Sequence, residues 1–257
     1  MLYSIKAYIK FLKKATNQHG IHSPFVYQLV TKCFYNTSNH EAYKKLKAYR
    51  RDLYKNSNTI TITDFGSGSR VFKSNKRVIS KIAKTSGITA KRAKLLFRLA
   101  QYFDSKNILE LGTSLGLGTS ALILAQNNAK ITSIEGCPET AKMAQQQFEK
   151  HQLLNIDLKI SAFDKILSEL ASNSYDLIYI DGNHQKEATI NYYETLLPTV
   201  NNNSVLVFDD IHWSKGMTEA WEIIKQHDKV TVSIDTFFWG IVFFRKEQVK
   251  EHFTIRV

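Results

Sequence analysis

Two short clusters in the C-terminal half of the chain combine carboxylates with imidazoles. Asp181-Gly-Asn-His184 directly follows one apolar run, and Asp209-Asp210-Ile-His212 directly follows the next one. A neutral imidazole can take a proton from a hydroxyl group near neutral pH, and carboxylates are ligands for hard cations such as Mg²⁺. The clusters therefore predict proton-transfer chemistry by His184, Asp209 and His212, with a divalent cation as the alternative route.

The apolar runs before these clusters read as strands of a parallel sheet. From residue 107 onward, short apolar strands alternate with helical segments, which is typical of an α/β sheet covered by helices on both faces. Strands are predicted at 107–111, 130–134, 157–160, 175–180, 204–208, 230–234 and 240–244, and helices at 118–127, 138–151, 164–171, 185–197 and 215–227. The last connection, residues 235–239, is too short for a parallel crossover, so the final strand should be antiparallel to its neighbour. Both acid–histidine clusters then project from one edge of the sheet.

A glycine-rich loop, Glu110-Leu-Gly-Thr-Ser-Leu-Gly-Leu-Gly118, follows the strand at 107–111. Part of it matches the G-x-G-x-x-A fingerprint of dinucleotide-binding proteins. However, the first glycine of that match, Gly116, stands five positions after Leu111, and Glu110 would repel a pyrophosphate. S-adenosylmethionine suits the carboxylate better because it carries a sulfonium and an ammonium group. We therefore expect this cofactor, with a dinucleotide or an unliganded turn as alternatives.

Two further acids follow the neighbouring strands. Glu135 stands 135 − 110 = 25 positions after Glu110, close to the spacing of about 20 that brings an acid to ribose hydroxyls. Asp164 follows the third strand, where it would meet the adenine amino group or cap a helix. The residues expected to bind the cofactor are Glu110, Gly112, Thr113, Ser114, Gly116, Gly118, Thr119, Glu135, Gly136, Asp164 and Asp181.

Four segments together resemble the class I S-adenosylmethionine-dependent methyltransferase superfamily, nearest to its catechol-type and cephalosporin-biosynthesis-like O-methyltransferases. They are Glu110-Leu-Gly112-Thr-Ser-Leu-Gly116, Ile134-Glu135-Gly136, Tyr175-Asp-Leu-Ile-Tyr-Ile-Asp181-Gly-Asn-His184 and Val207-Phe-Asp209-Asp210-Ile-His212. The resemblance covers roughly residues 85–250. It implies a Rossmann-like, mostly parallel sheet of seven strands in the order 3-2-1-4-5-7-6, with strand 7 antiparallel.

The resemblance also bears on the metal. In catechol-type relatives a divalent metal is held by an Asp after strand four and an Asp-Asn pair after strand five. Asp181 and Asp209 match this pattern, whereas Asp210 replaces the Asn. The resemblance thus implies a Mg²⁺ site at Asp181, Asp209 and Asp210 that is more negative than the family pattern.

Residues 1–84 lie outside the resemblance, so we expect a helical N-terminal extension before a methyltransferase domain at 85–257. Its first 14 residues place apolar side chains at helical spacing with lysines on the other face. Its segment Asp64-Phe-Gly66-Ser-Gly68 imitates a cofactor loop, but no acid-bearing strand follows 25 positions later. We interpret that segment as a turn.

Composition limits the function classes. The net charge of +12 favours anionic partners, while the two widely separated cysteines indicate no disulfide framework and suit a reducing cytoplasm. Neither a signal peptide nor an apolar stretch of membrane-spanning length is evident. We expect a cytoplasmic enzyme that methylates an oxygen of a small molecule. A tRNA or rRNA methyltransferase and a non-catalytic protein with the cofactor fold are the alternatives, and the N-terminal helices offer a surface for a homodimer.

Overall fold

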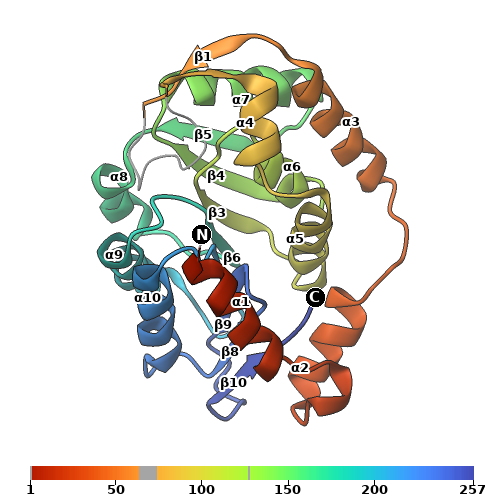
Figure 1. Cartoon of the computed structure of the whole chain (residues 1–257), viewed down its shortest axis with the longest axis vertical. Helices are drawn as coiled ribbons and strands as arrows, with labels where there is room; N and C mark the ends of the chain where they lie inside the picture. Colours follow the sequence, from red (N-terminus) through yellow and green to blue (C-terminus); the bar gives the residue numbers. More distant parts are fainter. Residues whose placement is uncertain (1, 64–73, 127) are drawn as a thin grey trace. The chain divides into compact units, whose positions relative to one another are not determined.

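The computed structural model describes residues 2–63, 74–126 and 128–257 (Figure 1). The chain divides into two compact units. One, here called the continuous unit, is Thr37–Ile166, and the other, the split unit, combines Met1–Asn36 with Leu167–Val257. The turn predicted at Asp64, Gly66 and Gly68 lies outside the described residues.

The continuous unit contains three parallel strands in the order β3-β4-β5. Helices α6 and α7 pack against these strands. Strands β1 and β2 pair in a separate antiparallel ladder. The elements are α3 (Ala42–Lys55), β1 (Thr59–Thr61), β2 (Lys76–Val78), α4 (Ile79–Thr85), α5 (Ala90–Tyr102), β3 (Asn107–Leu111), α6 (Leu117–Ile123), β4 (Lys130–Glu135), α7 (Pro138–Lys150) and β5 (Ile156–Ile160).

Local sequence explains where these elements begin. Strand β3 is buried along four consecutive residues, as expected for a parallel strand covered on both faces. Helix α5 begins after Thr89, whose hydroxyl accepts a hydrogen bond from the Arg92 N–H. Helix α7 begins with Pro138, whose missing N–H costs nothing in the first turn.

The split unit contains five strands in the order β6-β7-β9-β8-β10. Strand β6 is parallel to β7, β9 is antiparallel to β7 and β8, and β10 is parallel to β8. Helices α9 and α10 pack against each other (Figure 1). The elements are α1 (Leu2–Lys14), η1 (Gln18–Gly20), α2 (Pro24–Leu29), η2 (Val30–Phe34), β6 (Leu177–Ile180), α9 (Lys186–Leu196), η3 (Leu197–Thr199), β7 (Val205–Asp209), α10 (Lys215–Gln226), β8 (Val232–Asp235), β9 (Trp239–Phe243) and β10 (Glu251–Thr254), while α8 (Phe163–Leu170) crosses the boundary between the units.

The predicted α/β class and strand order are confirmed within each unit. The order β5-β4-β3 reproduces 3-2-1, and β6-β7-β9-β8 reproduces 4-5-7-6 with β9 as the predicted antiparallel strand. The predicted number of seven strands is wrong, because β10 is an eighth. Its sequence, Glu251-His-Phe-Thr254, contains one buried residue, Phe253, and therefore no apolar run that would predict a strand. The strand forms through backbone pairing with β8.

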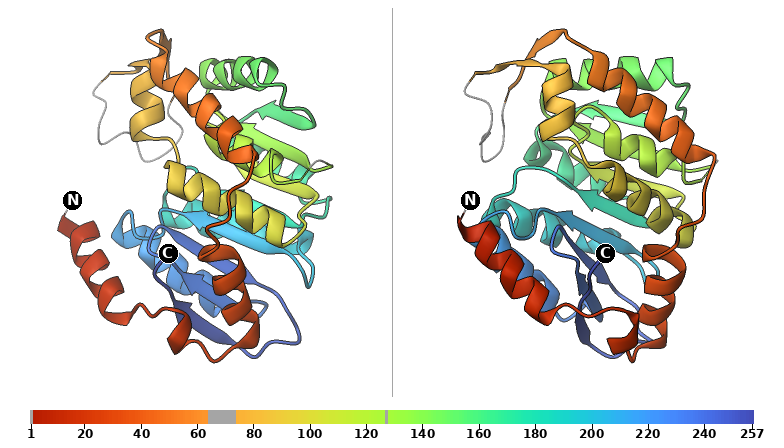
Figure 2. Two further views of the ribbon diagram at one scale, coloured as in Figure 1. Left: turned by 90° about the vertical axis from the view of Figure 1, so that its right-hand side faces the viewer. Right: turned by 45° about the vertical axis from the view of Figure 1, so that its right-hand side comes forward.

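The predicted N-terminal helix is confirmed as α1, which Figure 2 shows in red. Phe11, its one buried residue, packs with its ring centroid 5.6 Å from that of Phe237. After the helix, the Thr16 N–H donates to the Thr254 carbonyl at 2.9 Å. The helix is thus attached to the C-terminal part of the split unit. The predicted boundary between residues 84 and 85, which separates an extension from the family domain, stays a prediction.

Candidate functional site

The loop after β3 turns through left-handed backbone at three positions. Gly112 has φ +106°, Ser114 has φ +49° and Gly116 has φ +76°. At Gly116 a side chain is excluded twice, because φ is positive and a Cβ atom would collide with the Tyr49 hydroxyl and the Phe148 ring. Gly112 and Gly116 therefore form corners of a tightly supported loop.

Glu110 lies inside this support, fully buried. Its Oε2 accepts hydrogen bonds from the Thr119 hydroxyl at 2.5 Å and the Ser133 hydroxyl at 2.6 Å. Its Oε1 has no hydrogen-bond partner among the described residues. Burial raises the pKa of this carboxyl to about 7, although the two hydroxyls oppose the shift. Glu110 thus ties β3 to α6 and β4, and its contact with a ligand stays a prediction.

Glu135, at the end of β4, closes the loop from the other side. Its Oε2 accepts from the Ser114 N–H at 2.8 Å, and its Oε1 accepts from the Cys137 N–H at 2.9 Å. Burial raises the pKa of the carboxyl, while these backbone donors and that of Gly136 act against the shift. The structure therefore brings the second predicted acid directly onto the glycine loop.

The remaining predicted cofactor residues of the continuous unit lie on helices or beside them. Gly118 and Thr119 belong to the first turn of α6 and are buried. The Thr113 hydroxyl shares a hydrogen bond of 2.5 Å with that of Ser133. Asp164 is exposed in the first turn of α8, where a carboxylate interacts favourably with the helix dipole. Both roles predicted for Asp164 remain open.

Tyr49 and Ser133 support the loop and were not predicted from the sequence. The Tyr49 hydroxyl, from α3, donates to the Leu115 carbonyl at 2.9 Å and is buried. The two residues are 66 positions apart, so no local pattern reveals the contact. Ser133 lies inside β4, where its only sequence signal was that of a strand residue.

In the split unit, the ends of β6 and β7 place two carboxylates around one hydroxyl. The Tyr179 hydroxyl lies 3.1 Å from Asp181 Oδ2 and 2.8 Å from Asp209 Oδ2. Asp209 also accepts from the Asp210 N–H at 2.8 Å. Because one hydroxyl has a single hydrogen to donate, the pair concentrates negative charge that a proton or a cation would relieve. Tyr179 was not predicted.

His184 belongs to the same cluster. Its Nε2 lies 3.7 Å from Asp181 Oδ1, and both side chains are partly exposed. The backbone is left-handed at Asn183, His184 and Asp210, with φ values of +66°, +44° and +55°. Non-glycine residues in this region store strain, which concentrates at functional sites. The predicted meeting of His184, Asp181 and Asp209 is therefore seen in the structure.

His212 points to a different part of the split unit. Its Nδ1 lies 3.0 Å from the Thr218 hydroxyl and its Nε2 lies 2.9 Å from Asp235 Oδ2. Its ring stacks on Phe237 with centroids 5.3 Å apart. These contacts lead to α10 and β8 rather than to Asp181, and both ring nitrogens have partners. Asp235 ends β8, 23 positions away, and was not predicted.

The predicted metal residues do not form a metal site in the described part of the chain. No group of three or more His, Cys, Asp or Glu side chains there is arranged to hold a metal ion. Asp181 and Asp209 converge on the Tyr179 hydroxyl, and the Asp210 N–H donates to Asp209 Oδ1. Binding of Mg²⁺ by Asp181, Asp209 and Asp210 stays a prediction.

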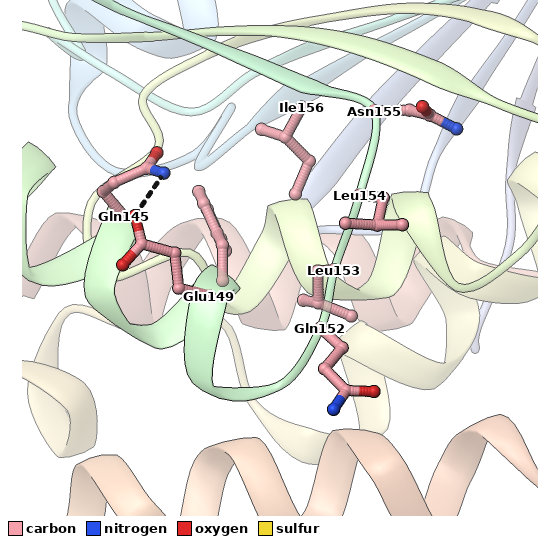
Figure 3. Close-up of a pocket in the computed structure, with 8 residues that line it drawn as sticks. Gln145, Glu149, Gln152, Leu153, Leu154, Asn155 and Ile156 are labelled. Carbon is pink, nitrogen blue, oxygen red and sulfur yellow. Dashed lines mark hydrogen bonds between the residues drawn. The ribbon is translucent and has the colours of Figure 1, made fainter.

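A cavity of about 430 Å³ beside the turn between α7 and β5 contains none of the predicted site residues. Figure 3 shows Gln145 and Glu149 joined by a hydrogen bond of 2.9 Å on its α7 side. The rest of its lining comes from Phe148 and residues 152–156. The predicted chemistry does not involve this cavity.

Known proteins resemble this chain in sequence and in structure. A family model described as a methyltransferase domain matches residues 109–211. A catechol O-methyltransferase from Niastella koreensis is 27% identical over 129 residues, which are 48% of this chain and 58% of that protein. The match therefore spans little more than half the length of that relative.

Solved structures extend the likeness over most of the chain. The methyltransferase PaMTH1 from Podospora anserina, bound to SAH, superposes with a TM-score of 0.61 at 14% identity, covering 88% of this chain and 97% of that one. The O-methyltransferase TomG from Streptomyces achromogenes, in complex with SAM, has a TM-score of 0.57 at 16% identity, covering 84% and 95%.

These likenesses define the class of fold as the Rossmann-like fold of methyltransferases. The methyltransferase-domain match at residues 109–211 covers most of the motifs from Glu110 to His212 that carry the predicted resemblance. Within the described residues, every helix is too short or too polar to cross a bilayer.

Proposed function

We propose that this protein transfers the methyl group of S-adenosylmethionine to an oxygen of a small molecule. The observation that carries the proposal is the loop after β3, where Glu135 binds the Ser114 N–H and glycines form the corners. The relative from Niastella koreensis is named as a catechol O-methyltransferase, and TomG is an O-methyltransferase in complex with SAM. Both support the same reaction class.

The continuous unit offers groups that suit the cofactor. Glycine corners at Gly112 and Gly116 permit close approach of the backbone to a ligand. Glu135 presents carboxylate oxygens at the end of β4, the usual position of an acid that accepts from ribose hydroxyls. Above its pKa of about 7, the buried carboxyl of Glu110 adds negative charge behind the loop, which favours a cationic ligand. S-adenosylmethionine supplies an electrophilic methyl group on a positively charged sulfur.

In the split unit we assign the proton transfer to His184. As the acceptor oxygen forms its bond to the methyl carbon and the carbon–sulfur bond breaks, the hydroxyl proton must leave. His184 Nε2 takes this proton, and Asp181, at 3.7 Å, stabilises the imidazolium. His184 is better suited than His212, because both ring nitrogens of His212 already have partners. Asp209, held by Tyr179, orients the acceptor.

The test measures cofactor binding and methyl transfer separately. Calorimetry with S-adenosylmethionine should show binding to the wild-type protein and to His184→Gln alike. Transfer of a tritiated methyl group to a panel of phenols should fall by about 100-fold or more in His184→Gln, the range of general-base effects.

The matched control is His227→Gln, which removes a partly exposed histidine 4.0 Å from Glu194. It should transfer the methyl group at the wild-type rate. Absence of S-adenosylmethionine binding in the wild-type protein would contradict the proposed function. An unchanged rate in His184→Gln would contradict only the role of that residue. Addition of Mg²⁺ or EDTA to the same assay tests the metal prediction.

A further inference from the structure

A cavity of about 300 Å³ lies beneath α1 in the split unit. Figure 2 shows α1 alongside this unit, and the walls of the cavity come from α1, α10 and the ends of β8 and β10. His212, three positions after the end of β7, also lines it. Strands β7, β8 and β10 run in the same direction, and open α/β sheets bind ligands at the carboxyl ends of such strands. The cavity is therefore in a position suited to a ligand.

The charge of the cavity is positive. Lys6, Lys10 and Lys14 line it at intervals of four residues along α1, which puts them on one face of the helix. Among the described residues none of these three lysines forms an ion pair. The two acids in the lining already have cationic or imidazole partners. Asp235 lies 2.9 Å from His212, and Glu222 lies 2.7 Å from Lys225. Three lysine charges thus remain for an anion.

The size and the remaining walls of the cavity restrict the anion further. Phe11, Ala7 and Tyr3 give it apolar and aromatic surface. A volume of about 300 Å³ is at the small end of ligand pockets, which suits one ring rather than a nucleotide. Aromatic walls favour a flat partner. Lys13 and Ile9 of α1 do not line the cavity.

We propose that the cavity beneath α1 binds a small aromatic acid, whose anionic group pairs with Lys6, Lys10 and Lys14 and whose ring packs against Phe11. The cavity is separate from the proposed transfer site, because His212 lines it and His184, Asp181 and Asp209 do not. Recognition of the acid is the role of α1.

The experiment is calorimetry on the full chain with four probes. The acids are 3,4-dihydroxybenzoate and 4-hydroxyphenyl phosphate, and their uncharged counterparts are catechol and phenol. The acids should bind the wild-type protein about tenfold more tightly, since each lysine pair is worth up to about fivefold in affinity. The variant Lys10→Gln/Lys14→Gln should lose that advantage, whereas Lys13→Gln should keep it.

A second variant pair separates the cavity from general attraction to a positive protein. Ala7→Phe fills the cavity without a change of charge and should weaken binding of both acids by about tenfold. Ile9→Phe adds the same side chain at a position of α1 that does not line the cavity, and this variant should bind as the wild type does. Equal affinity of acids and uncharged counterparts, or equal binding by Ala7→Phe and Ile9→Phe, would overturn the proposal.

The same variants distinguish the two proposals from each other. If S-adenosylmethionine binds but no acid depends on the α1 lysines, the cavity proposal fails and the proposed function stands. If an acid binds in the cavity but S-adenosylmethionine does not bind, the proposed function fails and the cavity remains a binding site.

Discussion

The glycine loop of the continuous unit and the acid–histidine cluster of the split unit differ in how their charged side chains are held. Around the loop, hydrogen bonds from backbone and hydroxyl donors restrain the carboxylates of Glu110 and Glu135. Around the cluster, one hydroxyl faces two carboxylates, and left-handed backbone falls on Asn183, His184 and Asp210. The first region is rigid before a ligand arrives, and the second concentrates charge and strain. Changes in the loop should therefore alter binding and stability, whereas changes in the cluster should alter turnover.

The largest effect is expected at the corner of the loop. Gly116→Ala forces a side chain into left-handed backbone and against Tyr49 and Phe148, so the free energy of unfolding should fall by about 2–5 kcal/mol and cofactor binding should be lost. Urea denaturation and calorimetry measure the two effects. The control is Gly216→Ala, whose Cβ atom would meet nothing closer than 3.4 Å. Equal stability of the two variants would show that the corner is not rigid.

The next effect belongs to the cluster. Asp209→Asn keeps the shape of the side chain but removes its charge, so kcat should fall by about 100-fold with little change in the Kd for S-adenosylmethionine. Tritium transfer and calorimetry provide the two values. Asp157→Asn, in the exposed part of β5, should change neither. If the Kd rose by the same factor as kcat fell, the cluster would also contribute to cofactor binding, and the proposed difference between the two regions would be wrong.

Stability should depend on pH through Glu110. The folded carboxyl keeps its proton up to a pKa of about 7, whereas its ordinary value is 4.5. Between these values the folded state binds more protons than the unfolded state, so stability falls as pH rises, by about 3 kcal/mol in total. Glu110→Gln should remove the Glu110 part of that slope, leave the part due to Glu135, whose pKa burial also raises, and be more stable than the wild type at pH 8. Denaturation between pH 4.5 and 8 measures it, with the exposed Glu149→Gln as the control that keeps the slope.

The smallest effect is expected from Tyr179→Phe. Without the hydroxyl, the carboxylates of Asp181 and Asp209 lose a shared hydrogen-bond donor. We expect kcat, measured by tritium transfer, to fall by about tenfold, the magnitude of one hydrogen bond to a charged group. Tyr175→Phe, which changes another buried tyrosine, should leave kcat unchanged. Equal kcat values for the two variants would mean that Tyr179 does not position the acids.

The sequence predicted those features that depend on short-range patterns. Apolar runs located β3, β6 and β7, and the direction of neighbouring strands predicted that Asp181 and Asp209 would meet. The sequence did not predict β10, because this strand pairs with β8 through its backbone and has no run of apolar side chains.

Hydrogen-bond partners that are far apart in the chain also could not be predicted from the sequence. The support of the loop by Tyr49 depends on how α3 packs, and the pairing of His212 with Asp235 depends on how one side chain turns after β7. Two histidines that follow neighbouring strands at the same distance looked equivalent in the sequence. Only the tertiary structure distinguishes the one beside Asp181 from the one beneath α1.

The division of the chain also bears on how the protein is made. The split unit needs residues from both sides of the continuous unit, which inserts 166 − 36 = 130 residues between them. At 5–20 residues per second, the first segment waits on the ribosome for on the order of ten seconds before its partners are synthesised. During that time Phe11 has no Phe237 to pack against, and Thr16 has no Thr254 to bind. The continuous unit can fold first, and a nascent chain stalled near residue 166 would present α1 to chaperones.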